Sequence, residues 1–147
     1  MNVQTSPDAN AVKALLQQVN LPTEDITPTL TESFIGHYDG LTLIGVVGYE
    51  PLGNVGLLRS LAVHPTARRG GLGAKLVAAI EALAAAQGVN TLYLLTTDAE
   101  AYFAHHGFAR VEREQAPVIV QKTEQFSSLC PGSATVMRKS LDESDTP

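Results

Sequence analysis

The segment from Arg68 to Gly73 reads Arg-Arg-Gly-Gly-Leu-Gly and lies between two stretches of opposite character. Residues 56–63 before it are mostly apolar, as in a buried strand, and His64-Pro65 ends that strand because proline cannot continue a β-ladder. Residues 72–87 after it place large apolar side chains three or four positions apart, which is helical spacing, and Gly88 is suited to end the helix. The chain is therefore predicted to fold here as a strand, a glycine turn and a helix in direct succession.

This glycine turn has the features of a phosphate receptor. Gly70, Gly71 and Gly73 lack the Cβ atom that would keep a ligand away from the backbone. The first amides of the following helix have no intrahelical partner, and the helix dipole adds partial positive charge at the same end. Arg68 and Arg69 add full charges in a chain whose net charge is −5. Together these features predict binding of a phosphate group.

Two common phosphate-binding motifs do not fit this turn. A Walker A loop requires lysine and then serine or threonine after its last glycine, whereas Ala74 follows Gly73. A dinucleotide fingerprint requires glycine or alanine three residues after its second glycine, where this chain has Leu76. The pattern Arg-x-x-Gly-x-Gly after Leu-Ala-Val-His-Pro instead resembles the acetyl-CoA-binding motif of the GCN5-related N-acetyltransferase (GNAT) superfamily. For the motif taken alone, a glycine turn that merely starts a helix is the alternative.

A second segment carries the same resemblance. Residues 99–108 resemble a GNAT element in which a short helix bears an aromatic pair, here Tyr102 and Phe103, and ends in Gly107-Phe108. The resemblance then extends over residues 33–139 and implies an α/β (α+β) fold. In that fold a mixed, mostly antiparallel central sheet is split into a V and flanked by helices. A chain of 147 residues is long enough for one core, so we expect a single domain with residues 142–147 as a frayed tail.

The resemblance also implies how acetyl-CoA is held. The pantetheine arm would pair with the backbone of residues 61–63, the pyrophosphate would lie on the amides of residues 69–74, and Phe103 would lie beside the sulfur. Amides near Leu61 or Ala62 would face the acetyl carbonyl and stabilise the tetrahedral oxyanion. The implied cofactor-binding residues are Leu61, Ala62, Val63, Arg68, Arg69, Gly70, Gly71, Leu72, Gly73, Ala74 and Phe103. No cysteine–histidine cluster has the spacing of a zinc site, so no metal is expected.

The residues expected to transfer protons depart from the family pattern. The tyrosine that serves as general acid in many members is Phe103 here, which has no proton to give. Tyr102 is the remaining candidate acid, but it lies about 100 degrees further round the helix, and core packing is its alternative. The usual strand glutamate is absent, which makes Glu50 the candidate base, with a solvated surface carboxylate as the alternative. Arg59 is expected either to bind a substrate carboxylate or to form a structural salt bridge, because a buried arginine needs a partner.

The rest of the sequence narrows the class of protein. A net charge of −5 argues against broad nucleic-acid binding, and no apolar stretch reaches membrane-spanning length or follows a basic N-terminus. We therefore expect a cytoplasmic enzyme that transfers the acetyl group of acetyl-CoA to a small-molecule amine. A CoA-binding regulatory or sensory protein is the alternative, followed by an acetyltransferase acting on protein lysines or N-termini. Homodimers are common in this family, and the sequence leaves the oligomeric state open.

A narrower resemblance links the chain to arsenic. Residues 57–63, 92–97 and 126–134 are similar to a subgroup of arsenic-resistance-associated acetyltransferases. Cys130 is the single cysteine, so an intrachain disulfide is excluded, and one thiolate is too few for trivalent arsenic, which favours several. We expect Cys130 to pack near the substrate end of the cleft.

Local signals predict where other elements begin and end. Ser6 followed by Pro7 predicts the start of a helix, with serine as the cap. The dipeptide Asp39-Gly40 predicts a hairpin between residues 33–38 and 41–50. Thr97 and Glu100 have the spacing of a capping box at the start of the helix that carries the aromatic pair.

Overall fold

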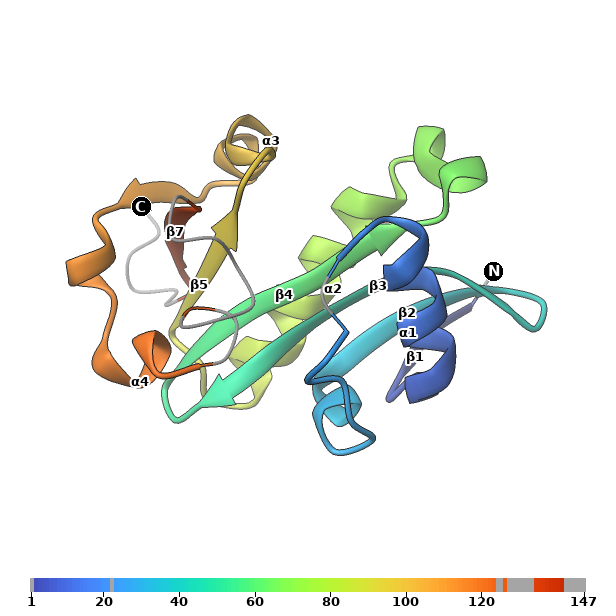
Figure 1. Ribbon diagram of the computed structural model, residues 1–147, viewed down its shortest axis with the longest axis horizontal. Helices are drawn as coiled ribbons and strands as arrows, with labels where there is room; N and C mark the ends of the chain where they lie inside the picture. Colours follow the sequence, from blue (N-terminus) through green and yellow to red (C-terminus); the bar gives the residue numbers. More distant parts are fainter. Residues whose placement is uncertain (1, 22, 124–125, 127–133, 142–147) are drawn as a thin grey trace. The chain divides into compact units, whose positions relative to one another are not determined.

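The computed structural model describes residues 2–21, 23–123, 126 and 134–141 (Figure 1). In these residues the strands form a seven-stranded sheet in the order β1-β2-β3-β4-β5-β7-β6. The pairs β1–β2, β2–β3, β5–β7 and β6–β7 are antiparallel, and β4 pairs with β5 in parallel. A mixed, mostly antiparallel sheet with helices confirms the predicted fold class. The chain contacts divide into two compact units, residues 1–50 with 59–83 and residues 51–58 with 84–147, which are described separately below.

The first unit contains most of the elements in the N-terminal half of the chain. In chain order they are β1 (Asn2–Thr5), α1 (Ala9–Gln18), the 3-10 helix η1 (Leu30–Ser33), β2 (Phe34–Asp39), β3 (Thr42–Leu52), β4 (Val55–Val63), the 3-10 helix η2 (Pro65–Gly70) and α2 (Leu72–Ala86). The last residues of β3, the first four of β4 and the end of α2 belong to the second unit. The turn between β2 and β3 confirms the hairpin predicted at Asp39-Gly40.

The second unit contains the remaining elements. They are β5 (Thr91–Thr96), α3 (Glu100–His105), β6 (Ala109–Val111), the 3-10 helix η3 (Arg113–Gln115), α4 (Val118–Gln121) and β7 (Thr135–Ser140). The parallel pairing of β4 with β5 joins residues 55–57 to residues 91–93. Cys130 and residues 142–147 lie outside the described part of the chain.

Two predicted helix starts are wrong. Helix α1 is capped by Asp8, whose carboxylate accepts a hydrogen bond from the Ala11 amide at 3.0 Å, so Ser6 lies outside the helix. Aspartate is among the strongest N-cap residues, and its position nearer to the apolar stripe decides between the two candidates. Helix α3 has Ala99 as its N-cap, without a side-chain cap, and the Ala99 amide donates to the Thr96 hydroxyl at 3.0 Å. The predicted capping box of Thr97 and Glu100 is therefore not formed.

Helix α3 ends in a Schellman motif, as its Gly-Phe sequence favours. Gly107 has φ 94°, which suits glycine, and the Phe108 amide donates to the carbonyl of Phe103 at 3.0 Å. The rings of Phe103 and Phe108 then make the apolar contact typical of the motif, with centroids 5.8 Å apart. Helix α2 ends in the same way at Gly88, with the Val89 amide bonded to Ala84. Both ends confirm positions predicted from the glycines.

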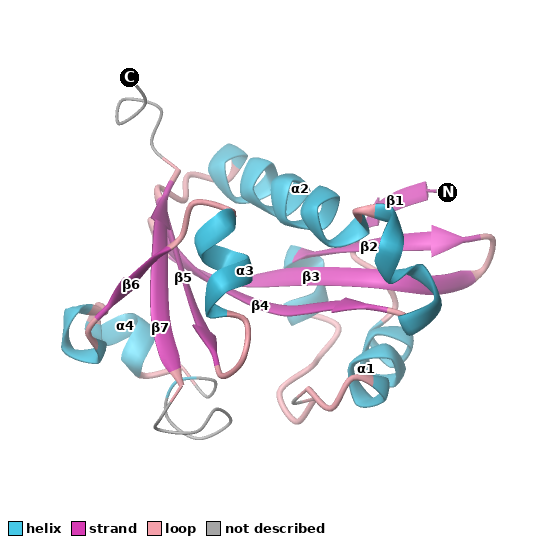
Figure 2. Cartoon of the chain, turned by 90° about the horizontal axis from the view of Figure 1, so that it is seen from above, coloured by secondary structure: helices cyan, strands magenta, loops and turns pink. Residues whose placement is uncertain are grey.

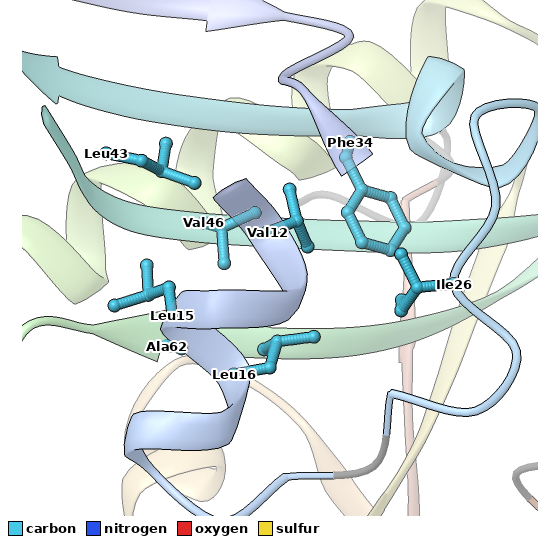
Figure 3. Close-up of a cluster of buried hydrophobic side chains, with 8 residues drawn as sticks. All are labelled: Val12, Leu15, Leu16, Ile26, Phe34, Leu43, Val46 and Ala62. Carbon is cyan, nitrogen blue, oxygen red and sulfur yellow. The ribbon is translucent and has the colours of Figure 1, made fainter. Parts of the chain in front are cut away.

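The core of the first unit lies on both faces of β2 and β3. Figure 2 shows α1 and α2 on opposite faces of these strands. On the α1 side, buried side chains form the cluster drawn in Figure 3: Val12, Leu15, Leu16, Ile26, Phe34, Leu43, Val46 and Ala62. On the α2 side, a Cβ on Gly45 would lie 2.9 Å from Leu72 and 3.0 Å from Leu76. The missing side chain at Gly45 therefore lets α2 approach β3 closely, which sets the height of the helix above the sheet.

The core of the second unit is built in a similar way. Val120 of α4 packs on one face of β5 and β7, against a cluster that also contains Leu57, Tyr93, Ala116 and Val136. Lys139, whose side chain projects from the opposite face of β7, donates from Nζ to the carbonyl of His106 at 2.9 Å. Helix α3 and its Schellman motif therefore lie on the face of the sheet opposite to α4.

Candidate functional site

The first residues of the glycine turn belong to a short 3-10 helix that the sequence did not predict. Helix η2 begins with Pro65 in its first turn, and the His64 ring at its N-cap accepts a hydrogen bond from the Thr66 amide at 3.3 Å. The His64 amide donates to the carbonyl of Ile44 in β3 at 2.7 Å, which fixes the entry to the turn. The backbone of Arg68, Arg69 and Gly70 forms the end of η2, and the side chains of the two arginines lie outside the described part.

Gly71 joins η2 to α2 in a left-handed conformation, with φ 71°. The Lys75 amide donates to the Gly71 carbonyl at 3.2 Å, which closes the first turn of α2. The amides of Leu72, Gly73 and Ala74 precede that hydrogen bond, so they are the helix N-terminal donors that have no intrahelical acceptor. A Cβ on Gly71 would meet no atom within 4 Å. The space beside the turn is open, as a backbone receptor for a phosphate requires.

Strand β4 contains a second left-handed residue just before the turn. Ser60 has φ 61° although it is neither glycine nor at a chain reversal. A residue in this conformation interrupts the alternation of side chains between the two faces of a strand, and it changes the direction of the adjacent peptide groups. Ala62 is buried in the α1 cluster, whereas Leu61 and Val63 on either side are partly exposed. The predicted cofactor strand, residues 61–63, therefore directly follows a backbone irregularity.

Arg59, beside Ser60, is a buried ion-paired arginine. Its side chain is 1% exposed, and its guanidinium forms two hydrogen bonds with the Asp25 carboxylate, one of them from Nη2 to Oδ1 at 2.6 Å. Nη1 also donates to Oε1 of Glu50 at 2.8 Å, and Nε donates to the Ser60 hydroxyl at 3.0 Å. Burial disfavours the guanidinium charge, but the hydrogen bonds and charges of Asp25 and Glu50 outweigh it and raise the pKa of Arg59.

These contacts bear on two sequence predictions. Of the alternatives for Arg59, the structure contains the salt bridge, with both partners supplied by the chain. Glu50 is not a freely solvated carboxylate, because its side chain is 18% exposed and accepts from Arg59. Asp25 was missed by the sequence reasoning, and no local pattern could have found it, since it is 34 residues from Arg59 in the chain. The left-handed conformation of Ser60 was also missed, because serine rarely adopts positive φ and no sequence pattern marks it.

The aromatic pair of the second unit divides between the interior and the surface. Phe103 is buried, and its ring meets the Phe108 ring edge to face. Tyr102 is 39% exposed, so the core-packing alternative for this residue is wrong. The centroid of its ring lies 4.6 Å from that of His106, the C-cap residue of α3. Partial burial raises the pKa of Tyr102 above its ordinary value of 10.0, so the hydroxyl keeps its proton at neutral pH.

Neither a metal site nor a membrane-spanning helix is found among the described residues. In that part of the chain, no three histidine, cysteine, aspartate or glutamate side chains come close enough together to hold a metal ion. None of its helices combines the length and the apolar character needed to cross a membrane.

Comparison with known proteins identifies the family. Residues 11–109 match the model of the acetyltransferase (GNAT) family. An amino-acid acetyltransferase from Ectopseudomonas mendocina (strain ymp) is 47% identical over 62 residues, which are 42% of this chain and 14% of that protein. The chain thus spans about one seventh of the length of this curated relative. The relatives matched in this way are named for amino acids and not for arsenic.

Solved structures support the fold independently. N-acetylglutamate synthase from Neisseria gonorrhoeae, complexed with coenzyme A and N-acetyl-glutamate, has a TM-score of 0.80 at 22% identity, over 96% of this chain and 35% of that one. An acetyltransferase of the GNAT family from Staphylococcus aureus Mu50 has a TM-score of 0.74 at 18% identity and is matched over 99% of its own length. The family model covers two thirds of the chain and includes β4, the glycine turn and α3, and the chain belongs to the GNAT acetyltransferase family.

Proposed function

We propose that this protein is an acetyl-CoA-dependent N-acetyltransferase that acetylates the amine of a free amino acid. One observation carries the proposal: a left-handed Gly71 with open space beside it leads directly into α2, and helix η2 connects it to strand β4, which is distorted at Ser60. Membership of the GNAT family supports the same cosubstrate.

The backbone would provide most of the cofactor contacts. Residues 61–63 would pair with the pantetheine arm as an added strand. The amides of Leu72, Gly73 and Ala74, at the positive end of the 15-residue helix α2, would hold the pyrophosphate. Arg68 and Arg69 would add charge beside them. Access of the pyrophosphate to these amides depends on Gly71, because any side chain at that position would extend into the open space next to them.

The chemistry requires little beyond correct placement. Acetyl-CoA supplies an activated thioester, and the acceptor amine must be neutral to attack it. The amides of Leu61 and Ala62 would stabilise the oxyanion that develops on the acetyl carbonyl. Glu50, directly or through water, is the proposed route for the amine proton, and proximity supplies the remaining acceleration. Phe103 has no proton to give, so the departing thiolate would take its proton from water, with Tyr102 as the alternative donor.

The matched relatives narrow the class of amine that we propose as the acetyl acceptor. The matched curated proteins are named amino-acid acetyltransferases, and one similar structure contains N-acetyl-glutamate. An α-amino acid is therefore the acceptor we propose first. The resemblance of residues 57–63, 92–97 and 126–134 to arsenic-resistance-associated acetyltransferases is the basis of a narrower proposal, a role in arsenic resistance or detoxification.

Cofactor binding is tested by Gly73→Val. Gly73 lies within α2 and is not among the residues with positive φ, so valine fits the backbone there but extends beside the pyrophosphate amides. Titration calorimetry with CoA should show at least tenfold weaker binding. Ala82→Val, an exposed position further along α2, is the matched control and should bind CoA as the wild type does. Equal affinity in both variants would remove the basis of the proposal.

An assay of turnover distinguishes the proposed enzyme from the alternative, a CoA-binding regulatory protein. The purified protein is incubated with acetyl-CoA and each common amino acid, and with aminoarsenicals in a separate arm, and acetylated products are identified by mass spectrometry. The proposal expects an N-acetyl amino acid. Tight CoA binding with no product from any amine would favour the regulatory alternative. A product from the arsenical arm alone would support the arsenic link instead.

A further inference from the structure

Arg59 and its partners connect segments that are far apart in the chain. Asp25 lies in the connector between α1 and η1, Glu50 lies near the end of β3, and Ser60 lies in β4. All four residues belong to the first unit. The Arg59 side chain is 1% exposed, and those of Asp25 and Glu50 are 13% and 18% exposed. An arginine this deeply buried is stable there because several acceptors surround it.

The hydrogen bond from Arg59 to Ser60 bears on the strand distortion. Ser60 holds a φ of 61° that side-chain-bearing residues seldom adopt, so other contacts must favour it. Its hydroxyl accepts from Nε of Arg59 at 3.0 Å, and that guanidinium is in turn fixed by Asp25 and Glu50. A fork-shaped guanidinium can make all of these bonds at once, whereas a lysine ammonium cannot reproduce their directions.

The connector is fixed to β4 at two places around Ser60. Asp25 binds Arg59 on one side of Ser60. The next connector residue, Ile26, is buried in the cluster that contains Ala62, on the other side of Ser60. The ionic and apolar contacts therefore hold the same two segments together, and Ser60 lies between them.

We propose that Arg59 is a positioning residue for acetyl transfer, which holds Ser60 left-handed and thereby sets the direction of the Leu61 and Ala62 amides. This inference rests on the proposed function, because those amides are the proposed oxyanion donors. In this role Arg59 acts through Ser60 and touches neither acetyl-CoA nor the amine. Its carboxylate partners lock the guanidinium and also hold the connector beside the same strand.

The test compares Arg59→Lys with Arg110→Lys. Arg110 is 69% exposed and lies 3.8 Å from Glu100, so it is a matched surface control. Arg59→Lys should lower kcat at least tenfold, while the Kd for CoA, to which the unaltered glycine turn also contributes, should stay within threefold. Arg110→Lys should leave both constants unchanged. The double variant Arg59→Lys, Ser60→Gly should have a kcat at least threefold higher than Arg59→Lys alone, because glycine adopts positive φ without stabilising contacts from other residues.

Backbone NMR provides a readout that needs no turnover. In the wild type, the Leu61 and Ala62 amide resonances should differ between the acetyl-CoA and CoA complexes, whereas those of Leu72, Gly73 and Ala74 should respond alike to both. In Arg59→Lys the difference at Leu61 and Ala62 should disappear.

Three results would separate the possible failures. If residues 72–74 do not respond to CoA, the proposed function fails. If they respond but Leu61 and Ala62 do not distinguish the two ligands, the positioning role is wrong and the cofactor site stands. If Arg59→Lys lowers kcat and the affinity for CoA equally, and Ser60→Gly restores neither, Arg59 supports the fold in general and the inference is overturned.

Discussion

Phe103 and Tyr102 are neighbours on α3 with opposite environments. Phe103 turns into the second unit and packs on Phe108, whereas Tyr102 is 39% exposed beside the ring of His106. Consecutive helical residues differ by about 100 degrees in direction, so one cannot occupy the position of the other without rotation of the helix. The Schellman motif at Gly107 and the Phe103–Phe108 contact oppose that rotation.

We therefore predict that Tyr102→Phe changes kcat less than tenfold. The measurement is a pH–rate profile of wild type and variant. Because the pKa of Tyr102 is raised above 10.0, a role as general acid would appear as a fall in the wild-type rate above pH 10 that the variant lacks. A loss of a hundredfold or more, with that change in profile and unaltered stability, would make Tyr102 the acid.

At the scale of elements, the pairing of β2 with β3 depends on a missing side chain. Gly48 pairs with Phe34, and a Cβ on Gly48 would lie 2.0 Å from ring atoms of Phe34. Phe34 is fully buried in the α1 cluster shown in Figure 3, so its ring has little room to move. The close packing of α1 on these strands therefore requires glycine at this position.

Gly48→Ala should lower the free energy of unfolding by about 2–3 kcal/mol, the upper part of the usual range of about 1–3 kcal/mol for overpacking a core. Urea denaturation monitored by circular dichroism measures it. Gly53→Ala is the matched control: it has φ 79° with no atom within 4 Å of its Cβ, so it should lose about 1 kcal/mol from backbone strain alone. A smaller loss at Gly48 than at Gly53 would contradict the packing argument.

Over the whole molecule, the sequence could predict features that depend on residues close together in the chain, and it failed for features that depend on distant ones. The hairpin at Asp39-Gly40 and the helix ends at Gly88 and Gly107 are short-range features, and all were found. The helix starts failed where several capping residues competed within a few positions, as with Ser6 and Asp8. Strand β1 and the 3-10 helix η2 carry no strong pattern and were missed.

For the candidate site too, the sequence could indicate the features made by neighbouring residues but not those made by residues far apart in the chain. The glycine turn and α2 could be located from residues adjacent in the chain, because their geometry is made by the backbone. The Arg59–Asp25 pair joins residues that are 34 positions apart, and its existence depends on how the connector folds over β4. Serine has no intrinsic preference for the left-handed region, so nothing in the residue type of Ser60 could indicate its φ of 61°.

The stability of the whole molecule should depend on one buried imidazole. His37 in β2 is 6% exposed, and within the described part of the chain neither ring nitrogen has a hydrogen-bond partner. Burial lowers the pKa of His37 below 6.5, with further lowering by the N-terminal amine and Lys75, and Asp39 opposes the change. The folded protein therefore binds fewer protons at His37 than the unfolded chain does as the pH falls through 6.5.

It follows that titration of His37 does not reduce the free energy of unfolding above pH 6.5, and that it reduces this free energy progressively as the pH falls below 6.5. The slope can reach roughly 1.4 kcal/mol per pH unit, the limit for one proton. Urea unfolding at pH 7.5, 6.5 and 5.5 should show this loss in the wild type and in the control His105→Gln, an exposed histidine of α3. His37→Leu, which removes the titrating group and its two unpaired nitrogens, should flatten the dependence over this range. At pH 7.5 the free energy of unfolding of His37→Leu should equal or exceed that of the wild type, because a buried polar group without a partner destabilises the fold. A His37→Leu protein that retained the wild-type slope would show that the sensitive group lies elsewhere.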